Sequence, residues 1–377
     1  MNILYLSSVD IPTDKASGLA IIRQCEAFYS NGHHLELVVP MRSNHNNSVE
    51  DRYGIKVTFL LTRIKGNAIY GFGKTGFGLM LFRDSLKMFW LFWKKRHTVD
   101  IIYSRDYRLL LLFALLGFGK KCYLEMHTKH EGVLVRFVLR KVRKVIVISE
   151  GLKNYYAPYV SRSDIQLEPS GVDLEQFEDL LPTTVLREKL NVPLDARVVG
   201  YIGKYTTMGE SKGVDELIEA FAEIWELISE AYLLIVGLES GEMQMLQEKC
   251  SSLGIPPERF GLHPLNQKKF AEYVACVDIA IANYPDTEHY REYMSPTKLF
   301  AYLAGRKIVI ASNLPSIRLI ASDSVVYVEP GNVEALKTAL LNVFAHKDRY
   351  SSLCKNTDIS RYSWDCRAER ILSARHL

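Results

Sequence analysis

The stretch Tyr293-Met294-Ser295-Pro296-Thr297-Lys298-Leu299-Phe300-Ala301-Tyr302-Leu303-Ala304-Gly305, continued by Arg306-Lys307-Ile308-Val309-Ile310-Ala311-Ser312, combines a loop, a helix and a short apolar strand. Pro296 fits the first helical turn, where its missing N–H is not needed. The free N–H groups of Thr297 and Lys298 would then point out of the helix start, toward any bound anion. Geometry alone leaves two interpretations open, an ordinary helix cap and a phosphate site.

Short apolar runs separated by helical patterns continue in both directions from this stretch. Such runs are typical of parallel strands that are buried on both faces. In the first half we expect strands at 3–7, 35–39, 57–61, 101–103, 122–126 and 145–148, and in the second half at 198–202, 232–236, 260–262, 279–282, 308–311 and 325–328. Two such series predict an α/β protein with two Rossmann-like, doubly wound parallel-sheet domains and a ligand cleft at the carboxyl ends of the strands.

The expected join between the domains lies around residues 169–193, where Gly171, Pro182 and Pro193 interrupt regular structure. We therefore predict an N-terminal domain at 1–170 and a C-terminal domain at 171–360. A final segment at 361–377 is expected to form a helix that crosses back to the first domain.

Composition fits an intracellular enzyme with two cores. The chain has 377 residues, which is comfortable for two domains. Its six cysteines are scattered without a Cys-x-x-Cys pair, which favours reduced thiols and a cytoplasmic location and argues against a zinc site. The sequence enters a strand pattern directly at Met1, so no signal peptide is expected, and no apolar run reaches membrane-spanning length.

The net charge of +4 hides an asymmetry between the two halves. Residues 1–170 hold 25 Lys and Arg against 14 Asp and Glu, a net charge of +11, whereas residues 171–377 carry −7. A basic half beside an acidic half predicts that the N-terminal half faces an anionic surface or ligand. No nucleic-acid partner is expected.

The stretch at 295–304 resembles the donor-binding signature of glycosyltransferase family 4, the retaining, nucleotide-sugar-dependent enzymes of the GT-B fold. The family pattern runs Ser-Pro-x-Lys-Leu-Phe-Glu-Tyr-x-Ala, and a strand and a Leu-Pro-Ser/Glu-Ile-Arg loop follow it. Here the loop is Leu314-Pro315-Ser316-Ile317-Arg318. Two family glutamates are replaced: the one that grips the ribose hydroxyls is Ala301, and the one eight residues earlier is Tyr293.

The resemblance extends to further residues. Gly203-Lys204 and Lys212-Gly213 are similar to the family's Gly-Arg and Lys-Gly, whose cations bind the diphosphate; two solvated surface lysines would be the structural alternative. His127 follows an expected strand, where the family has a histidine near the transferred sugar. Gly18 matches a glycine turn that approaches the donor phosphate and the acceptor.

These matches define the predicted site. The resemblance implies that His127, Lys204 and Lys212 are catalytic. It also implies a set of donor-binding residues: Gly18, Lys204, Lys212, Met294, Ser295, Pro296, Thr297, Lys298 and Ala301. No Asp-x-Asp occurs in the chain, so we expect no metal and no cofactor, and a diphosphate site built from lysines and a helix dipole.

Two other segments are less specific. Residues 71–76, Gly-Phe-Gly-Lys-Thr-Gly, formally match the dinucleotide fingerprint, but no acidic ribose ligand follows about twenty residues on. The run Gly73-Lys74-Thr75 resembles part of a P-loop, but that motif needs a glycine at the position of Ala68, so we expect a glycine-rich loop. The aromatic residues at 82–93 precede the basic run at 94–97, and a second basic cluster lies at 136–144. This pattern fits a helix in a membrane interface and equally a core helix with a charged end.

The function that the resemblance implies is transfer of a hexose with retention, with glucose from UDP-glucose as the best candidate. The acceptor would be a glycan or a lipid-linked saccharide in polysaccharide or glycoconjugate biosynthesis. Peripheral association with an anionic membrane, at its inner face, is the alternative to a freely cytoplasmic enzyme. A non-catalytic GT-B homologue that acts as a binding or scaffold subunit is the competing hypothesis, and a GT-B epimerase is a third.

Overall fold

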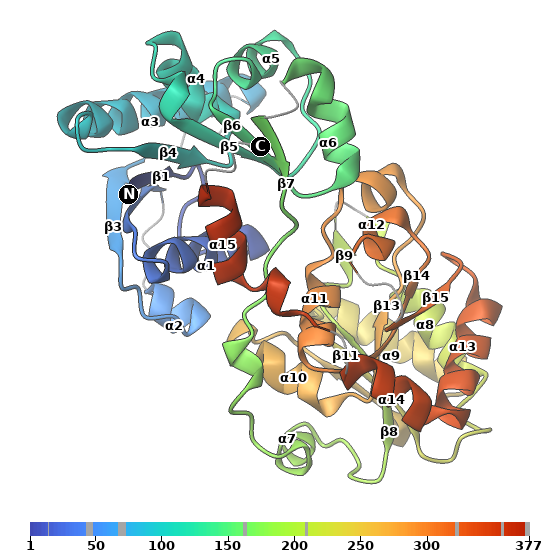
Figure 1. Ribbon diagram of the computed structural model, residues 1–377. Helices are drawn as coiled ribbons and strands as arrows, with labels where there is room; N and C mark the ends of the chain where they lie inside the picture. The colour runs from blue at the N-terminus through green and yellow to red at the C-terminus, as the bar shows by residue number, and fades with distance from the viewer. Residues whose placement is uncertain are drawn as a thin grey trace. The chain divides into compact units, whose positions relative to one another are not determined.

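The computed structural model describes residues 1–13, 15–42, 48–66, 73–160, 164–207, 210–320, 324–355 and 358–373. It divides into two compact units (Figure 1). The first unit comprises residues 1–171 together with residues from 362 onward, and the second comprises Val172–Arg361. The divisions lie one residue from the boundaries expected from the sequence.

The first unit is built on a parallel sheet in the order β3-β2-β1-β4-β5-β6-β7. Its strands are β1 Asn2–Leu6, β2 His34–Met41, β3 Leu60–Lys65, β4 Ile101–Ser104, β5 Cys122–Met126, β6 Lys144–Val147 and β7 Ile165–Leu167. The strand order reverses between β1 and β4, where Tyr5 pairs with Leu37 on one side and with Tyr103 on the other. In sheets of this kind the residues that follow such strands lie at the ligand-binding edge.

Helices cover both faces of this first sheet (Figure 1). They are α1 Ala16–Ser30, α2 Val49–Tyr53, α3 Gly73–Lys95, α4 Tyr107–Leu115, α5 Val133–Leu139, α6 Glu150–Tyr156 and, from the end of the chain, α15 Trp364–Leu372. Helix α15 packs beside α1, where Ala368 and Ile371 are fully buried in the same apolar cluster as Ile21 and Phe28. Helix α3 packs along α4, and α4 along α5.

The second unit has a parallel sheet in the order β12-β11-β8-β13-β14-β15, with its switch between β8 and β13. The strands are β8 Arg197–Ile202, β11 Ala231–Val236, β12 Phe260–His263, β13 Ile279–Ala282, β14 Ile308–Ser312 and β15 Val325–Val328; β9 Thr206–Thr207 and β10 Glu210–Ser211 form a separate antiparallel pair. Its helices are α7 Thr183–Lys189, α8 Val214–Ala222, α9 Ser240–Ser252, α10 Phe270–Cys276, α11 Thr297–Ala304, α12 Pro315–Arg318, α13 Val333–Ala345 and α14 Lys347–Lys355. A π-helical turn, η7 His289–Tyr293, precedes α11.

Short 3₁₀ turns complete the described secondary structure. They are η1 Gly119–Lys121, η2 Ala157–Tyr159, η4 Glu175–Phe177, η5 Pro257–Arg259, η6 Gln267–Lys269 and η8 Ser360–Tyr362.

Two apolar layers enclose the second sheet because its strands are buried on both faces. Along β8, Val199 and Tyr201 belong to one apolar cluster, and Val198 and Ile202 belong to the other. This alternation explains why the strands appear in the sequence as continuous apolar runs. It also confirms the predicted α/β class with two doubly wound parallel sheets.

Most predicted strands overlap the observed ones, and the exceptions are instructive. The strand expected at 57–61 is wrong in position, since β3 runs from Leu60 to Lys65. This strand lies at the sheet edge and carries Arg63 and Lys65, so it lacks the apolar run of a central strand. The three-residue β7 and the β9–β10 pair were not predicted, because such short strands give little pattern.

Among the described helices, none combines the length and the apolar composition that crossing a bilayer requires.

Candidate functional site

Three lysines lie in the second unit at the carboxyl ends of its central strands. Lys204 follows β8 and is exposed, whereas Lys212 precedes α8 and is half-buried. Lys298 lies in the first turn of α11 and is buried. The switch between β8 and β13 therefore has three cations near it, at the place where open α/β sheets bind ligands.

Close backbone packing brings these segments together. A Cβ atom on Gly213, which has φ +75°, would lie 1.8 Å from the carbonyl oxygen of Asn283, just after β13. Helix α11 is held to β8 by Tyr302, whose hydroxyl accepts a hydrogen bond from the N–H of Ile202 at 3.0 Å. Only glycine permits the first approach, and the position of Lys212 depends on it.

The side chain of Lys298 is buried, and the described side chains provide no counter-ion for it. It is 8% exposed, and within the described part of the chain its Nζ has no hydrogen-bond partner. The ammonium lies 3.7 Å from the ring centroid of Tyr201 and 4.8 Å from that of Tyr284. Burial, together with the charge of Lys212, holds the pKa of Lys298 well below its usual value. Cation–π contacts compensate only part of the lost hydration.

Lys212 is in a similar environment. Burial and the nearby charge of Lys204 lower the pKa of Lys212 to about 8. The carboxylate of Asp215, three residues after Lys212, accepts hydrogen bonds from Lys249 Nζ at 2.9 Å and from the Tyr205 hydroxyl at 2.6 Å. Among the side chains that the structure describes, no carboxylate pairs with Lys204, Lys212 or Lys298. An anion with two or more charges would relieve this repulsion.

The start of α11 adds backbone donors. The helix begins at Thr297, and Pro296 is its N-cap residue, so the prediction that Pro296 lies within the first turn is wrong by one position. Pro296 still supplies its carbonyl oxygen to the N–H of Leu299 at 2.9 Å. The N–H groups of Thr297 and Lys298 come earlier, where a helix offers no acceptor of its own. Met294 and Ser295 lead into this turn, and Met294 is buried.

The two positions that depart from the family pattern have distinct surroundings. Ala301 is buried in α11, at 6% exposure, so it contributes no polar group. Tyr293 ends the π-helical turn, and its hydroxyl donates to Oε1 of Glu288 at 2.9 Å. The carboxylate of Glu288, five residues earlier in the chain, therefore lies beside the side chain that replaces the missing glutamate. Sequence reasoning missed Glu288, because only the π-helical turn brings it there.

In the first unit, His127 follows β5 directly and is held by a buried carboxylate. Its Nε2 lies 2.5 Å from Oε1 of Glu125, which also pairs with Arg105 at 3.1 Å and with Arg367 of α15 at 3.0 Å. Burial alone would raise the pKa of Glu125, but the two arginines and His127 hold it well below its usual range.

The ionised Glu125 determines which nitrogen of the His127 ring carries the proton. Burial and the charge of Arg105 lower the pKa of His127 despite the neighbouring carboxylate. The neutral ring therefore donates Nε2–H to Glu125 and leaves Nδ1 as an acceptor. The side chain is about one-third exposed, so Nδ1 can receive a hydrogen bond from a hydroxyl group.

Gly18 lies within a helix, and not in a glycine turn between elements as the sequence predicts. It lies in the first turn of α1, and a Cβ atom there would lie 2.4 Å from the Tyr53 hydroxyl and 2.5 Å from Thr13 Cγ2. The chain's own side chains thus account for this glycine. The glycine-rich segment 71–76 is likewise not a loop in its described part, because α3 begins at Gly73; residues 71 and 72 lie outside the described residues.

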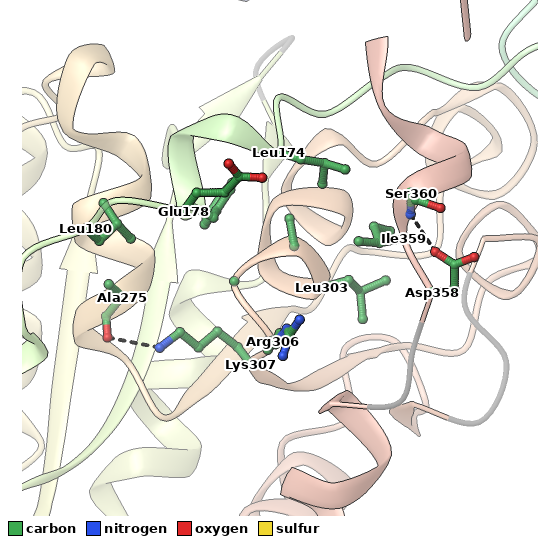
Figure 2. Close-up of a pocket in the computed structure, with 13 residues that line it drawn as sticks. Leu174, Glu178, Leu180, Ala275, Leu303, Arg306, Lys307, Asp358, Ile359 and Ser360 are labelled. Carbon is green, nitrogen blue, oxygen red and sulfur yellow. Dashed lines mark hydrogen bonds between the residues drawn. The ribbon is translucent and has the colours of Figure 1, made fainter. Parts of the chain in front are cut away.

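A separate hollow of about 480 Å³ lies at the opposite, carboxyl end of α11 (Figure 2). Its lining includes Leu303, Glu178 and Asp358, and Lys307 is turned away to donate to the carbonyl oxygen of Ala275 at 2.9 Å. Burial lowers the pKa of Lys307 to about 8. Two carboxylates, Arg306, Lys307 and a helix C-terminus line this hollow, so it has no excess of positive charge for a diphosphate. The lysine cluster at the other end of α11 remains the candidate site.

The predicted residues thus fall into two groups. Lys204, Lys212 and the segment 294–301 gather in the second unit, while Gly18 and His127 belong to the first. The burial of the Lys298 ammonium was not predicted, since only the N–H group of this residue had been considered as a ligand.

Comparison with known proteins is informative about the second unit. Residues 183–358 match the family model described as glycosyl transferases group 1. The second unit is therefore similar to the group 1 glycosyltransferase domain over most of its length. The matched range contains the whole lysine cluster and α11. No curated protein sequence matches the chain.

Solved structures that resemble the chain include glycosyltransferases of the GT-B fold. Sucrose-phosphate synthase from Thermosynechococcus elongatus has a TM-score of 0.74 at 17% identity, with 98% of this chain and 97% of that chain covered. HepE from Anabaena in complex with UDP has a TM-score of 0.72 at 15% identity, with 98% of both chains covered. WaaG, described as a glycosyltransferase involved in lipopolysaccharide biosynthesis, has a TM-score of 0.68 at 12% identity, with 99% and 100% covered. At these identities the likeness establishes the shared GT-B fold.

Proposed function

We propose that this protein transfers a hexose from a nucleotide diphosphate sugar, with UDP-glucose as the first candidate, to a free or lipid-linked saccharide. The observation that carries the proposal is the cluster of Lys204, Lys212 and Lys298, which no described carboxylate neutralises. The group 1 glycosyltransferase match supports it. HepE, a protein of the same fold, has been solved with UDP-glucose.

The lysines would act on the leaving group. As the glycosidic bond breaks, negative charge grows on the diphosphate, and preorganised cations stabilise that charge more than they stabilise the bound substrate. Lys204 and Lys212 would flank the diphosphate, and the N–H groups at the start of α11 would complete its coordination. Three cations supply the charge that a divalent metal provides elsewhere, so we propose a metal-independent site.

The sugar end of the reaction would involve the first unit. His127, held neutral with Nδ1 free to accept, is suited to bind a sugar hydroxyl rather than to protonate the leaving group. We propose transfer with retention, in which the leaving phosphate helps to deprotonate the acceptor on the same face of the sugar.

The test is turnover of UDP-glucose by the unmodified protein, with and without EDTA. We expect release of UDP in the presence of an acceptor mixture, and no loss of activity with EDTA. A requirement for magnesium or manganese would contradict the lysine site. Product analysis distinguishes transfer from epimerisation.

Lys212→Ala provides the matched binding test. It should weaken UDP binding by about 1.5–3 kcal/mol, the scale of a charge-assisted hydrogen bond, and leave uridine binding unchanged. Lys268→Ala, which removes an exposed lysine elsewhere in the same unit, should change neither. Equal losses for UDP and uridine would show that Lys212 acts through folding.

The replacement of two family glutamates by Tyr293 and Ala301 supports a second candidate, a non-catalytic scaffold subunit. That candidate predicts UDP binding without any sugar-nucleotide cleavage. Measured turnover by the unmodified protein would exclude it.

A further inference from the structure

Helix α3 exposes a row of large apolar side chains. The row consists of Leu79, Phe82, Leu86, Trp90 and Trp93, each between 44% and 57% exposed. At about 100° per residue these five positions fall within an arc of about 80°, and the row is about 21 Å long. Such a continuous apolar row marks an interaction surface, in contrast to scattered exposed apolar residues.

The row is separate from the face by which α3 joins the core. The buried face contains Leu81, Ser85, Met88 and Phe92, all at 2% exposure or less. Phe92 packs against Phe113 of α4 with ring centroids 5.3 Å apart. Helix α3 therefore has two apolar faces, and only one is used by the fold. The buried face agrees with the interpretation of residues 82–93 as a core helix, and the membrane interpretation stays a prediction about the exposed face.

Basic side chains run along one edge of the exposed row. Arg83, Lys87 and Lys94 follow it within an arc of about 40° by the same helical spacing. The Nζ of Lys94 lies 3.3 Å from the centroid of the Trp90 ring. The helix has one carboxylate, Asp84, which is buried and paired with Arg42. The exposed side of α3 is thus apolar and cationic, with no acidic group of its own.

A shallow hollow of about 440 Å³ adjoins the row, between α3 and the edge strand β3. Ile64, Leu86, Trp90 and Leu91 form its apolar wall, and Lys65 and Lys87 line the same hollow. Lys87 donates to the carbonyl oxygen of Lys65 at 2.5 Å, which fixes its ammonium beside the hollow. An apolar wall with fixed cations beside it is complementary to an acyl chain below an anionic head group.

We propose that α3 binds the surface of an anionic lipid membrane, with Leu79, Phe82, Leu86, Trp90 and Trp93 inserted at the level of the head groups and Arg83, Lys87 and Lys94 on the lipid phosphates. Tryptophan beside lysine and arginine is the pattern of interfacial helices, which bury their apolar face about 5–10 Å into the head-group region. The charge of +11 on residues 1–170 adds long-range attraction to acidic lipids.

A second copy of the chain fits this surface less well. An isologous contact would place the basic edges of two α3 helices close together without an acidic partner on the helix. A bilayer supplies both an apolar interior and negative charge. The surface lies in the first unit and the lysine cluster in the second, so membrane binding and nucleotide binding can be tested separately.

The test is co-flotation of the full chain with vesicles of phosphatidylglycerol and phosphatidylcholine. We expect binding to the acidic vesicles that falls as salt rises, and little binding to pure phosphatidylcholine. Phe82→Gln, Leu86→Gln and Trp90→Gln together should lower the vesicle partition coefficient at least about tenfold. Arg83→Gln with Lys94→Gln should lower it about fivefold for each charge. Emission of Trp90 and Trp93 should shift to the blue and be quenched by brominated lipid.

Matched controls separate the surface from general stickiness. Leu227→Gln removes an apolar side chain that is 65% exposed in the second unit, and it should leave vesicle binding unchanged. UDP binding and the thermal midpoint of every variant should match the unmodified protein, which shows that the variants fold. Absence of binding to acidic vesicles at low salt would overturn the proposal. So would self-association that the triple variant abolishes, because the surface would then serve a second copy.

Discussion

Lys298→Met is predicted to stabilise the nucleotide-free protein and to weaken nucleotide diphosphate binding at the same time. Methionine keeps the apolar stem and much of the volume of lysine and removes only the ammonium. That ammonium is buried without a hydrogen-bond partner in the described structure. An unsatisfied buried polar group costs about 1–3 kcal/mol, and the contact with the Tyr201 ring at 3.7 Å returns about 0.5–2 kcal/mol.

The expected gain in the free energy of unfolding is therefore about 1 kcal/mol. In a unit of this size that gain corresponds to a thermal midpoint about 2–4 °C higher. In the complex the same ammonium would face the diphosphate, so its removal should cost about 1.5–3 kcal/mol of UDP binding, or roughly a tenfold to 150-fold higher Kd. Uridine should bind as before.

Thermal unfolding without ligand and calorimetric titration with UDP and uridine measure the two effects. Lys268→Met, at an exposed site in the same unit, is the control and should change neither quantity. A lower thermal midpoint combined with equal weakening of UDP and uridine would refute the reasoning. It would show that Lys298 stabilises the fold and does not serve an anion.

Three further predictions concern other residues. The pKa of Lys212 is about 8 in the folded protein, whereas a free lysine titrates near 10.4, so its charge opposes folding below about pH 8 and this cost fades as pH rises from about 8 to 10. Because UDP favours the charged form of Lys212, calorimetry should show that UDP affinity falls above about pH 8. The Lys212→Ala variant should not show this fall. Ala301→Glu should lower the free energy of unfolding of the nucleotide-free protein by about 1–3 kcal/mol, because position 301 is buried. It should also strengthen the binding of UDP more than that of 2′,3′-dideoxy-UDP, which lacks the ribose hydroxyls. Equal effects on both ligands would show that the new carboxylate does not reach the ribose. Arg367→Met should lower the free energy of unfolding by about 3–5 kcal/mol, measured by chemical denaturation, since it removes one partner of the buried Glu125. A loss below about 1 kcal/mol would mean that Arg105 and His127 are sufficient to stabilise the charge of Glu125.

Sequence reasoning succeeded where local pattern and tertiary environment agree. The central strands, such as β5 and β13, are continuous apolar runs because helices cover both faces, and their bounds were predicted to the residue. The edge strand β3 was misplaced in the prediction, because its exposed charged residues interrupt the apolar pattern from which strands were predicted.

The site was predictable in residue type more than in geometry. Lys204 and Lys212 were selected for their position after β8 and before α8. The burial of Lys298 between Tyr201 and Tyr284 depends on contacts between β8, β13 and α11, which no local pattern encodes. The same applies to Glu288, which a π-helical turn brings to Tyr293, and to Gly18, whose small size serves packing against Tyr53.

The placement of α15 in the first unit has a consequence for synthesis of the chain. The second unit is one continuous segment and can fold as soon as it leaves the ribosome. The first unit begins with residue 1 but buries Ala368 and Ile371, and it takes Arg367 as a partner of Glu125. Its core therefore stays incomplete until the last part of the chain is made. During translation the half synthesised first is the half completed last, and a ribosome-bound chain that ends before residue 362 should show a protease-resistant second unit beside a first unit that is still open to cleavage.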